Sequence, residues 1–122
     1  MVLVDTSIWV FHFRQGSHRL ETLLEASDVM VHPFVIGELA CGHFKNRSEI
    51  LSLLQALPAA PVLGHDEFLQ FIERRSLAGL GIGFVDVHLL ASARLAGMPL
   101  WTLDKKLNFI AGDMKLSYDL EV

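Results

Sequence analysis

Two acidic residues stand directly after short apolar runs, where carboxylates can do chemistry. Asp5 follows residues 2–4, and Asp104 follows residues 100–103. Each run has the composition of a short buried strand. In a parallel sheet, side chains just beyond the strand ends meet at one edge, which is where sites in such folds lie. The carboxylate oxygens of Asp5 and Asp104 are hard ligands, so they would select Mg²⁺ or Mn²⁺ over zinc, which prefers His and Cys.

Two further acids stand in helical patterns. Asp86 opens the pattern of residues 84–95, and the residues at +3, +4 and +7 are Leu89, Leu90 and Ala93. Asp86 therefore begins the stripe that is expected to be buried rather than the solvated one. Glu38 lies in the pattern of residues 34–44.

Glu38 has apolar or small neighbours on its own helix face. The residues three and four positions away are Phe34, Val35, Cys41 and Gly42. A carboxylate on an apolar face is costly unless it is paired or holds a metal ion. The spacing therefore predicts a partner or a metal for Glu38.

Each acid alone also has an ordinary structural explanation. Asp5 and Asp104 could each cap the helix that follows, although Thr6 or Ser7 could cap in place of Asp5. Asp86 would favourably meet a helix dipole, and Glu38 could occupy a solvated edge. If all four meet, their repulsion would raise some of their pKa values, and a divalent cation would remove the conflict. Such a cation could activate a water that attacks a phosphodiester.

The elements that must position these acids are short strands alternating with helices. This order predicts an α/β fold in which helices cover both faces of a parallel sheet. The expected strands are residues 2–4, 29–31 and 100–103, with a possible last strand at 115–120. The expected helices are 7–13, 17–26, 34–44, 48–57, one capped by Asp66, 84–95 closing at Gly97 and 105–111.

Composition limits the remaining possibilities. The chain has 122 residues, 52% hydrophobic and 20% charged, which suits a single domain over residues 1–122. The net charge of -4 argues against a protein that mainly coats nucleic acid. No apolar stretch is long enough to span a membrane, and no secretory signal is expected. Cys41 is the only cysteine, so a cytoplasmic location is expected.

Four stretches in order resemble the PIN domain family, in particular the VapC toxins of bacterial toxin–antitoxin pairs. They are Val-Leu-Val-Asp-Thr-Ser at 2–7, Ile-Gly-Glu-Leu at 36–39, Gly-Phe-Val-Asp-Val-His-Leu-Leu-Ala at 83–91 and Leu-Trp-Thr-Leu-Asp-Lys-Lys-Leu at 100–107. Each stretch is weakly specific, but together they span nearly the whole chain in the family order.

The resemblance implies a small three-layer α/β/α fold with a short central parallel sheet, and a metal-dependent endoribonuclease. It also implies a homodimer and a cognate antitoxin that blocks the acidic cleft. The implied catalytic and metal-binding quartet is Asp5, Glu38, Asp86 and Asp104, supported by the hydroxyls of Thr6 and Thr102. Asp113 is the only nearby candidate for the further acid that some relatives use.

Other side chains have weaker functional interpretations. Lys105 and Lys106 follow Asp104 and could contact RNA phosphates, as could the pair at 74–75, although solvated helix charge is the default. His88 is two residues from Asp86, and helix geometry points such residues to different faces. We therefore interpret His88 as structural or as an edge residue of the cleft.

The leading hypothesis is a Mg²⁺-dependent ribonuclease toxin, with Mn²⁺ as an alternative ion. One alternative is a PIN nuclease that acts in RNA processing or on DNA without an antitoxin. Another is a non-catalytic, doubly wound binding module whose acids are only caps. A phosphotransferase with Asp5 as nucleophile is disfavoured, because position 7 is Ser rather than a second acid. The RNA target is not readable from the sequence.

Overall fold

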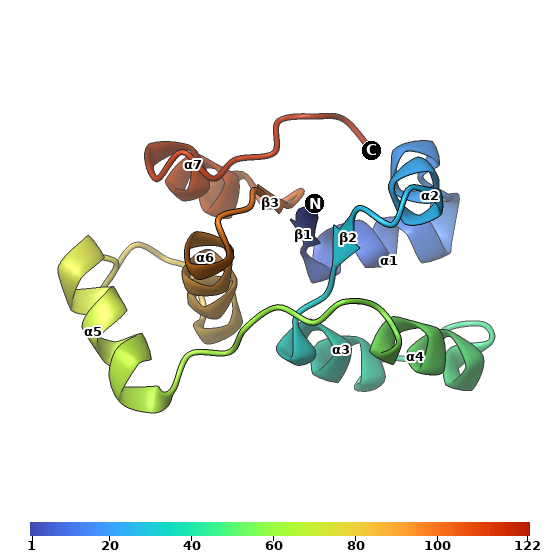
Figure 1. Ribbon diagram of the computed structural model, residues 1–122, viewed down its shortest axis with the longest axis horizontal. Coiled ribbons are helices and arrows are strands. Elements are labelled where there is room, and N and C mark those ends of the chain that lie inside the picture. Colours follow the sequence, from blue (N-terminus) through green and yellow to red (C-terminus); the bar gives the residue numbers. More distant parts are fainter.

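The computed structural model describes all of residues 1–122 as seven helices and a three-stranded sheet (Figure 1). In chain order the elements are β1 (Val2–Val4), α1 (Thr6–Gln15), α2 (His18–Glu25), β2 (Val29–Met30), α3 (Pro33–Ala40), α4 (Arg47–Gln55), α5 (His65–Arg75), α6 (Phe84–Ala96), β3 (Leu100–Trp101) and α7 (Lys105–Asp113).

The sheet is parallel throughout, in the order β2-β1-β3. Leu3 of the central strand pairs with Met30 on one side and Leu100 on the other. All three residues of β1 are at most 1% exposed, as the uninterrupted apolar run predicts for a strand covered on both faces. Because the strands run the same way, their carboxyl ends share one edge.

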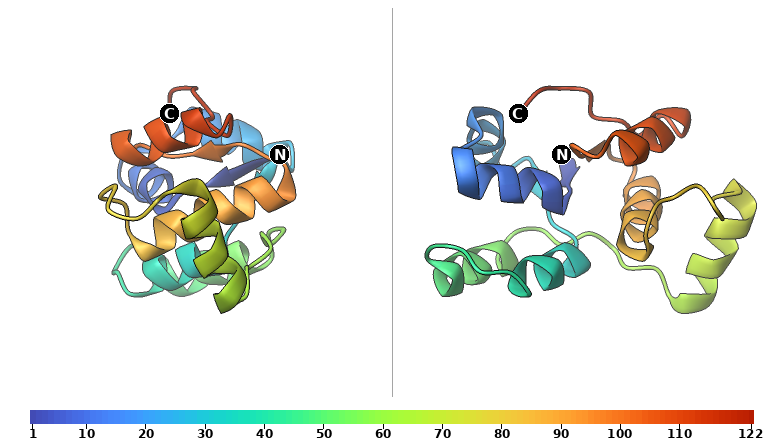
Figure 2. Two further views of the ribbon diagram at one scale, coloured as in Figure 1. Left: turned by 90° about the vertical axis from the view of Figure 1, so that its left-hand side faces the viewer. Right: turned by 180° about the vertical axis from the view of Figure 1, so that it is seen from behind.

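Helices lie on both sides of this sheet (Figures 1 and 2). The helices α1 and α2 lie on one side, and α6 and α7 lie on the other. The helix α5 stands at one end of the molecule, beyond α6. The expected three-layer α/β/α architecture is confirmed.

The helix α6 is the most buried helix, and Leu89, Leu90 and Ala93 of its predicted inward face are all buried. Its residues 87–93 are all buried, because the sheet and α5 cover it. The helix ends at Gly97, whose φ of 67° is easily reached only by glycine. His88 is 4% exposed and stacks on Phe68 with ring centroids 3.9 Å apart, so its structural interpretation is confirmed.

Two expected helix boundaries are wrong. The helix expected at 34–44 ends at Ala40, where Arg47 donates to the backbone carbonyls of Ala40 and Gly42 and so closes the helix end. Asp66 does not cap α5, because the N-cap position belongs to Gly64; Asp66 lies in the first turn instead.

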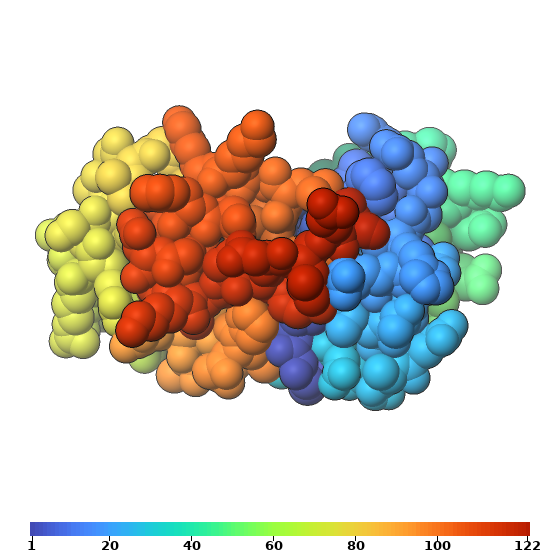
Figure 3. Space-filling model, turned by 90° about the horizontal axis from the view of Figure 1, so that it is seen from above, coloured from blue at the N-terminus to red at the C-terminus, as the bar shows by residue number.

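The strand expected at 100–103 ends at Trp101, and the strand expected at 115–120 does not form. Its residues make only an isolated bridge, in which Leu100 pairs with Ser117. Beyond this bridge the chain leaves the sheet and crosses toward α2. Trp101 Nε1 donates to Leu120 O at 2.9 Å, and Arg19 Nε donates to Glu121 O at 2.7 Å. Figure 3 shows this C-terminal segment reaching α2.

No helix of the chain is both long enough and apolar enough to cross a membrane.

Candidate active site

Asp5 lies at the shared carboxyl edge of the sheet, where its backbone N–H continues the ladder by donating to Trp101 O at 2.9 Å. Its side chain is only 6% exposed. The Oδ2 atom accepts hydrogen bonds of 2.7 Å from Ser7 Oγ and from Thr102 Oγ1. Asp5 occupies the N-cap position of α1, but its side chain makes no capping bond. The capping explanation for Asp5 is therefore wrong.

The same two hydroxyls also hold the loop that follows β3. Thr102 Oγ1 accepts from the backbone N–H of Asp104 at 3.0 Å, and Ser7 Oγ accepts from that of Leu103 at 3.0 Å. Asp104 is exposed, and its Oδ1 caps α7 by accepting from Leu107 N at 3.0 Å. For Asp104 the capping role is confirmed, and it occupies one oxygen only.

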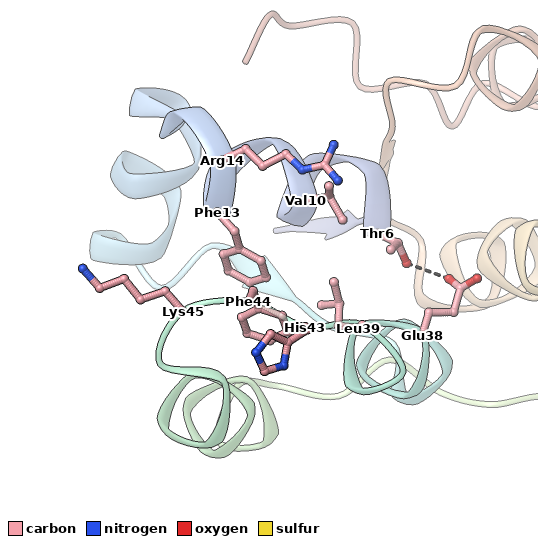
Figure 4. A pocket seen from close by; sticks show the side chains of 10 residues that line it. Thr6, Val10, Phe13, Arg14, Glu38, Leu39, His43, Phe44 and Lys45 are labelled. Carbon is pink, nitrogen blue, oxygen red and sulfur yellow. Dashed lines mark hydrogen bonds between the residues drawn. The ribbon is translucent and has the colours of Figure 1, made fainter.

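Glu38 reaches this edge from α3, but it is not on a buried face. The residue is exposed, and so are Cys41 and Gly42, which lie at and just beyond the end of α3, so Glu38 occupies the solvated edge. The expectation of a carboxylate surrounded by apolar residues is therefore wrong. The partner expected for Glu38 is present, since Thr6 Oγ1 donates to Glu38 Oε1 at 2.6 Å (Figure 4).

Asp86 is half-buried in the first turn of α6, where its Oδ2 accepts from Gly83 N at 3.1 Å. Burial raises the pKa of this carboxyl, and the negative charges of Asp5, Asp104 and Glu38 raise it further; only the Gly83 hydrogen bond opposes them. The other three acids are therefore close enough to Asp86 to act on its charge.

The four carboxylates share one pattern of hydrogen bonding. In each, one oxygen accepts from the protein, and the other accepts no hydrogen bond from the chain. The oxygens without a protein donor are Asp5 Oδ1, Glu38 Oε2, Asp86 Oδ1 and Asp104 Oδ2. Each side chain is therefore oriented while one oxygen stays available to a ligand.

The four carboxylates suit Mg²⁺, which keeps several waters, better than an ion that takes all its ligands from the protein. All the ligands are oxygens, and the mutual repulsion at Asp86 calls for a cation. However, no three of the acidic, His or Cys side chains converge on one point. Mg²⁺ usually takes one or two carboxylates and keeps several waters, so a site with spread carboxylates suits it.

Among the weaker candidates, Lys105 and Lys106 are the first two residues of α7. Both line a separate pocket that also contains Asp113. The ammonium of Lys106 lies against Gly81, in the turn that precedes α6. Asp113 is the last residue of α7 and is not among the charges that act on Asp86.

Sequence reasoning treated Ser7 only as a possible cap, whereas its hydroxyl contacts Asp5. A hydroxyl residue two positions after an acid at a strand end is the local signal that could have identified it. Arg14, whose side chain extends along α1 near the acidic edge, also went unnoticed (Figure 4).

Comparison with known proteins gives a consistent result. The sequence model described as "PIN domain" matches residues 2–113. Ribonuclease VapC32 from two strains of Mycobacterium tuberculosis is 44% identical over 123 aligned residues, covering 100% of this chain and 99% of the relative.

Solved structures share the fold at low sequence identity. FitAB bound to a DNA fragment has a TM-score of 0.65 and 17% identity, covering 100% of this chain and 99% of that one. FitAcB from Neisseria gonorrhoeae has a TM-score of 0.63 and 19% identity, with coverages of 92% and 94%. PAE2754 from Pyrobaculum aerophilum has a TM-score of 0.63 and 17% identity, with coverages of 89% and 83%.

Proposed function

This chain belongs to the PIN domain family, and we propose that it is a Mg²⁺-dependent endoribonuclease that acts as the toxin of a toxin–antitoxin pair. The observation that carries the proposal is the set of four carboxylates at one edge, each held through one oxygen and free at the other. The identity of 44% over the full length with a protein named a ribonuclease supports RNA as the substrate.

Asp5, Asp86 and Asp104 would hold the ions, each ion taking one or two of these carboxylates and several waters, and Glu38 would complete the site and help to orient water. When bound, Mg²⁺ supplies a Lewis acid for the phosphate and an activated water; Mn²⁺ can do the same. Thr102 and Ser7 hold the carboxylate of Asp5 in a fixed orientation by donating to its Oδ2. Thr6 orients the carboxylate of Glu38 by donating to its Oε1.

The partners follow from the resemblance to VapC toxins. We propose a cognate antitoxin protein that covers the acidic edge, and a homodimer as the active form. A small adjacent reading frame whose product relieves growth arrest would identify the antitoxin. Growth arrest without such a neighbour would favour a PIN nuclease that acts in RNA processing.

The direct test is cleavage of cellular RNA by the purified chain, followed by sequencing of the fragment ends. Cleavage should require Mg²⁺ or Mn²⁺ and should stop in EDTA. Asp5→Asn should cut at least ~100-fold more slowly, since metal ions stabilise transition-state charge by several kcal/mol. If Asp5→Asn cut as fast as the parent in Mg²⁺, the assignment of the site would be wrong.

A further inference from the structure

A groove leads away from the acidic edge and has basic side chains along its lining (Figure 4). It is a pocket of about 390 Å³ that shares Thr6 and Glu38 with the acidic edge. Arg14, His43 and Lys45 are also in its lining, with Lys45 at the end away from Glu38, and Glu38 is the only carboxylate there. The charge of the groove is thus opposite to that of the edge where it begins.

One wall of the groove is a single stripe of α1. Thr6, Val10 and Arg14 recur every four residues and so share one helix face. At 1.5 Å per residue, this stripe is about 12 Å long. Figure 4 shows the Arg14 guanidinium reaching back beside Val10 toward Thr6, because helical side chains lean toward the N-terminus. The positive charge therefore lies between the end of the groove and the acidic edge.

The opposite wall is the end of α3 and the loop after it. Phe44 in this loop stacks on Phe13 of α1, with ring centroids 4.8 Å apart and planes 15° from parallel. Arg47 ties the loop to α3 through the carbonyls of Ala40 and Gly42. The groove therefore has a partly apolar lining that is fixed by packing, and its cationic side chains come from both walls.

We infer that this groove binds the single strand of RNA on one side of the cleavage point, with Arg14 contacting the first phosphate beyond the acidic edge and Lys45 a later one. The inference rests on the proposed function for the position of the cleavage point. Carboxylates repel phosphates, so a strand held at the acidic edge needs cations within reach of its neighbouring phosphates. A positively charged groove that follows the backbone suits a single strand, and Arg14 and Lys45 supply positive charge along this one.

The test is RNA binding measured where no RNA is consumed. We would place all variants in the Asp86→Asn background and measure the anisotropy of a labelled, mixed-sequence, single-stranded RNA in Mg²⁺ between 50 and 200 mM KCl. Arg14→Gln should weaken binding about tenfold. It should also reduce the slope of log affinity against log salt by about 0.7, the value for one lost phosphate contact on a single strand. Arg14→Lys should keep that slope.

The sequence offered Arg74 as a possible phosphate contact, but the structure places α5 at the end of the molecule opposite α1 and α3 (Figure 1). Arg74→Gln removes the same charge from an exposed position there and is therefore the matched control. It should leave affinity within about twofold and the slope unchanged. Equal effects of Arg14→Gln and Arg74→Gln would refute the inference, because only general charge would then matter. Absence of RNA binding in the background chain would also refute it. A third contradicting result would be an Arg14→Gln variant that binds RNA normally but whose growth arrest the antitoxin no longer relieves. The groove would then bind the antitoxin rather than RNA.

The outcome separates this inference from the proposed function. If the parent with Asp86 intact cleaves RNA while Arg14→Gln binds RNA like Arg74→Gln, the function stands and the groove assignment fails. If the parent cleaves no RNA but binding depends on Arg14 as described, the groove assignment stands and the nuclease fails. In a cleaving enzyme, Arg14→Gln should raise KM by a larger factor than it lowers kcat.

Discussion

The hydroxyl of Thr102 donates a hydrogen bond of 2.7 Å to the carboxylate of Asp5, although 97 residues separate them in sequence. The same oxygen of Thr102 accepts from the backbone N–H of Asp104. One side chain therefore fixes the carboxylate at the end of β1 and the backbone position of the acid that follows β3.

Replacing Thr102 by Val should damage the site more than the fold. The side chain keeps its shape but loses both hydrogen bonds, so stability should fall by about 1–2 kcal/mol. Partners that orient a metal ligand are typically worth about 10–100-fold in metal affinity, so thermal stabilisation by Mg²⁺ should need 10–100 times more ion. Thr102→Ser keeps the hydroxyl and should behave almost like the parent. If Thr102→Val and Thr102→Ser needed the same Mg²⁺ concentration for half of the thermal stabilisation, Thr102 would not orient a metal ligand.

Asp104 and Asp113 provide a matched pair of acids at opposite ends of α7. Asp104→Asn should reduce Mg²⁺-dependent RNA cleavage by on the order of 100-fold or more. Its stability should change by less than about 0.5 kcal/mol, because asparagine can still cap Leu107 N. Asp113→Asn should cleave within about twofold of the parent. A large loss in Asp113→Asn would bring that residue into the site.

Neutralising Asp86 should stabilise the metal-free chain. Since its pKa is raised in the folded state, the unfolded chain loses this proton first, and ionised Asp86 costs stability as the pH rises through the ordinary value toward the raised one. In EDTA, Asp86→Asn should therefore melt at a higher temperature than the parent at pH 7. The difference should vanish below the ordinary pKa, and Mg²⁺ should stabilise the parent more than the variant.

The control for Asp86 is Asp66→Asn, because Asp66 is also an acid in the first turn of a helix. It should lose about 0.3–1 kcal/mol of favourable dipole interaction and gain nothing. If both variants melted at a lower temperature than the parent at pH 7, the only effect of Asp86 on stability would be its favourable interaction with the dipole of α6.

His32 should make the fold sensitive to mild acid. It is fully buried, its Nδ1 accepts from Phe34 N at 2.9 Å, and its Nε2 lies 3.1 Å from Ser92 Oγ. Burial, and to a smaller degree the nearby His88, lower the pKa of His32 to about 4. Below pH 6.5 the unfolded chain takes up this proton before the folded chain does. Stability is therefore full above pH 6.5 and should fall by about 3 kcal/mol by pH 4 from this residue.

Denaturant unfolding at several pH values measures this dependence. His32→Asn should be less stable at pH 7 because it loses packing, but its stability should fall less steeply between pH 6.5 and 4. His18→Asn changes an exposed histidine and should keep the slope of the parent. A parent-like slope in His32→Asn would assign the acid sensitivity to other groups.

The sequence by itself determined the elements and the candidate acids. Periodicity, proline and glycine are local signals, so they predicted the buried strand 2–4, the inward stripe of α6 and its end at Gly97. They also placed Asp5 and Asp104 just beyond strand ends. Boundaries failed where a side chain outside the helix decides them, as at Ala40, where the Arg47 side chain closes α3.

Only the tertiary structure decided what each acid contacts. The bond between Thr102 and Asp5 depends on the register of β1 against β3, which no local pattern encodes. The exposure of Glu38 and its bond to Thr6 depend on how α3 packs against α1. The sequence could therefore name the four carboxylates, because residue type and strand ends are local. Which oxygen of each is held and which stays free is fixed by contacts between distant segments.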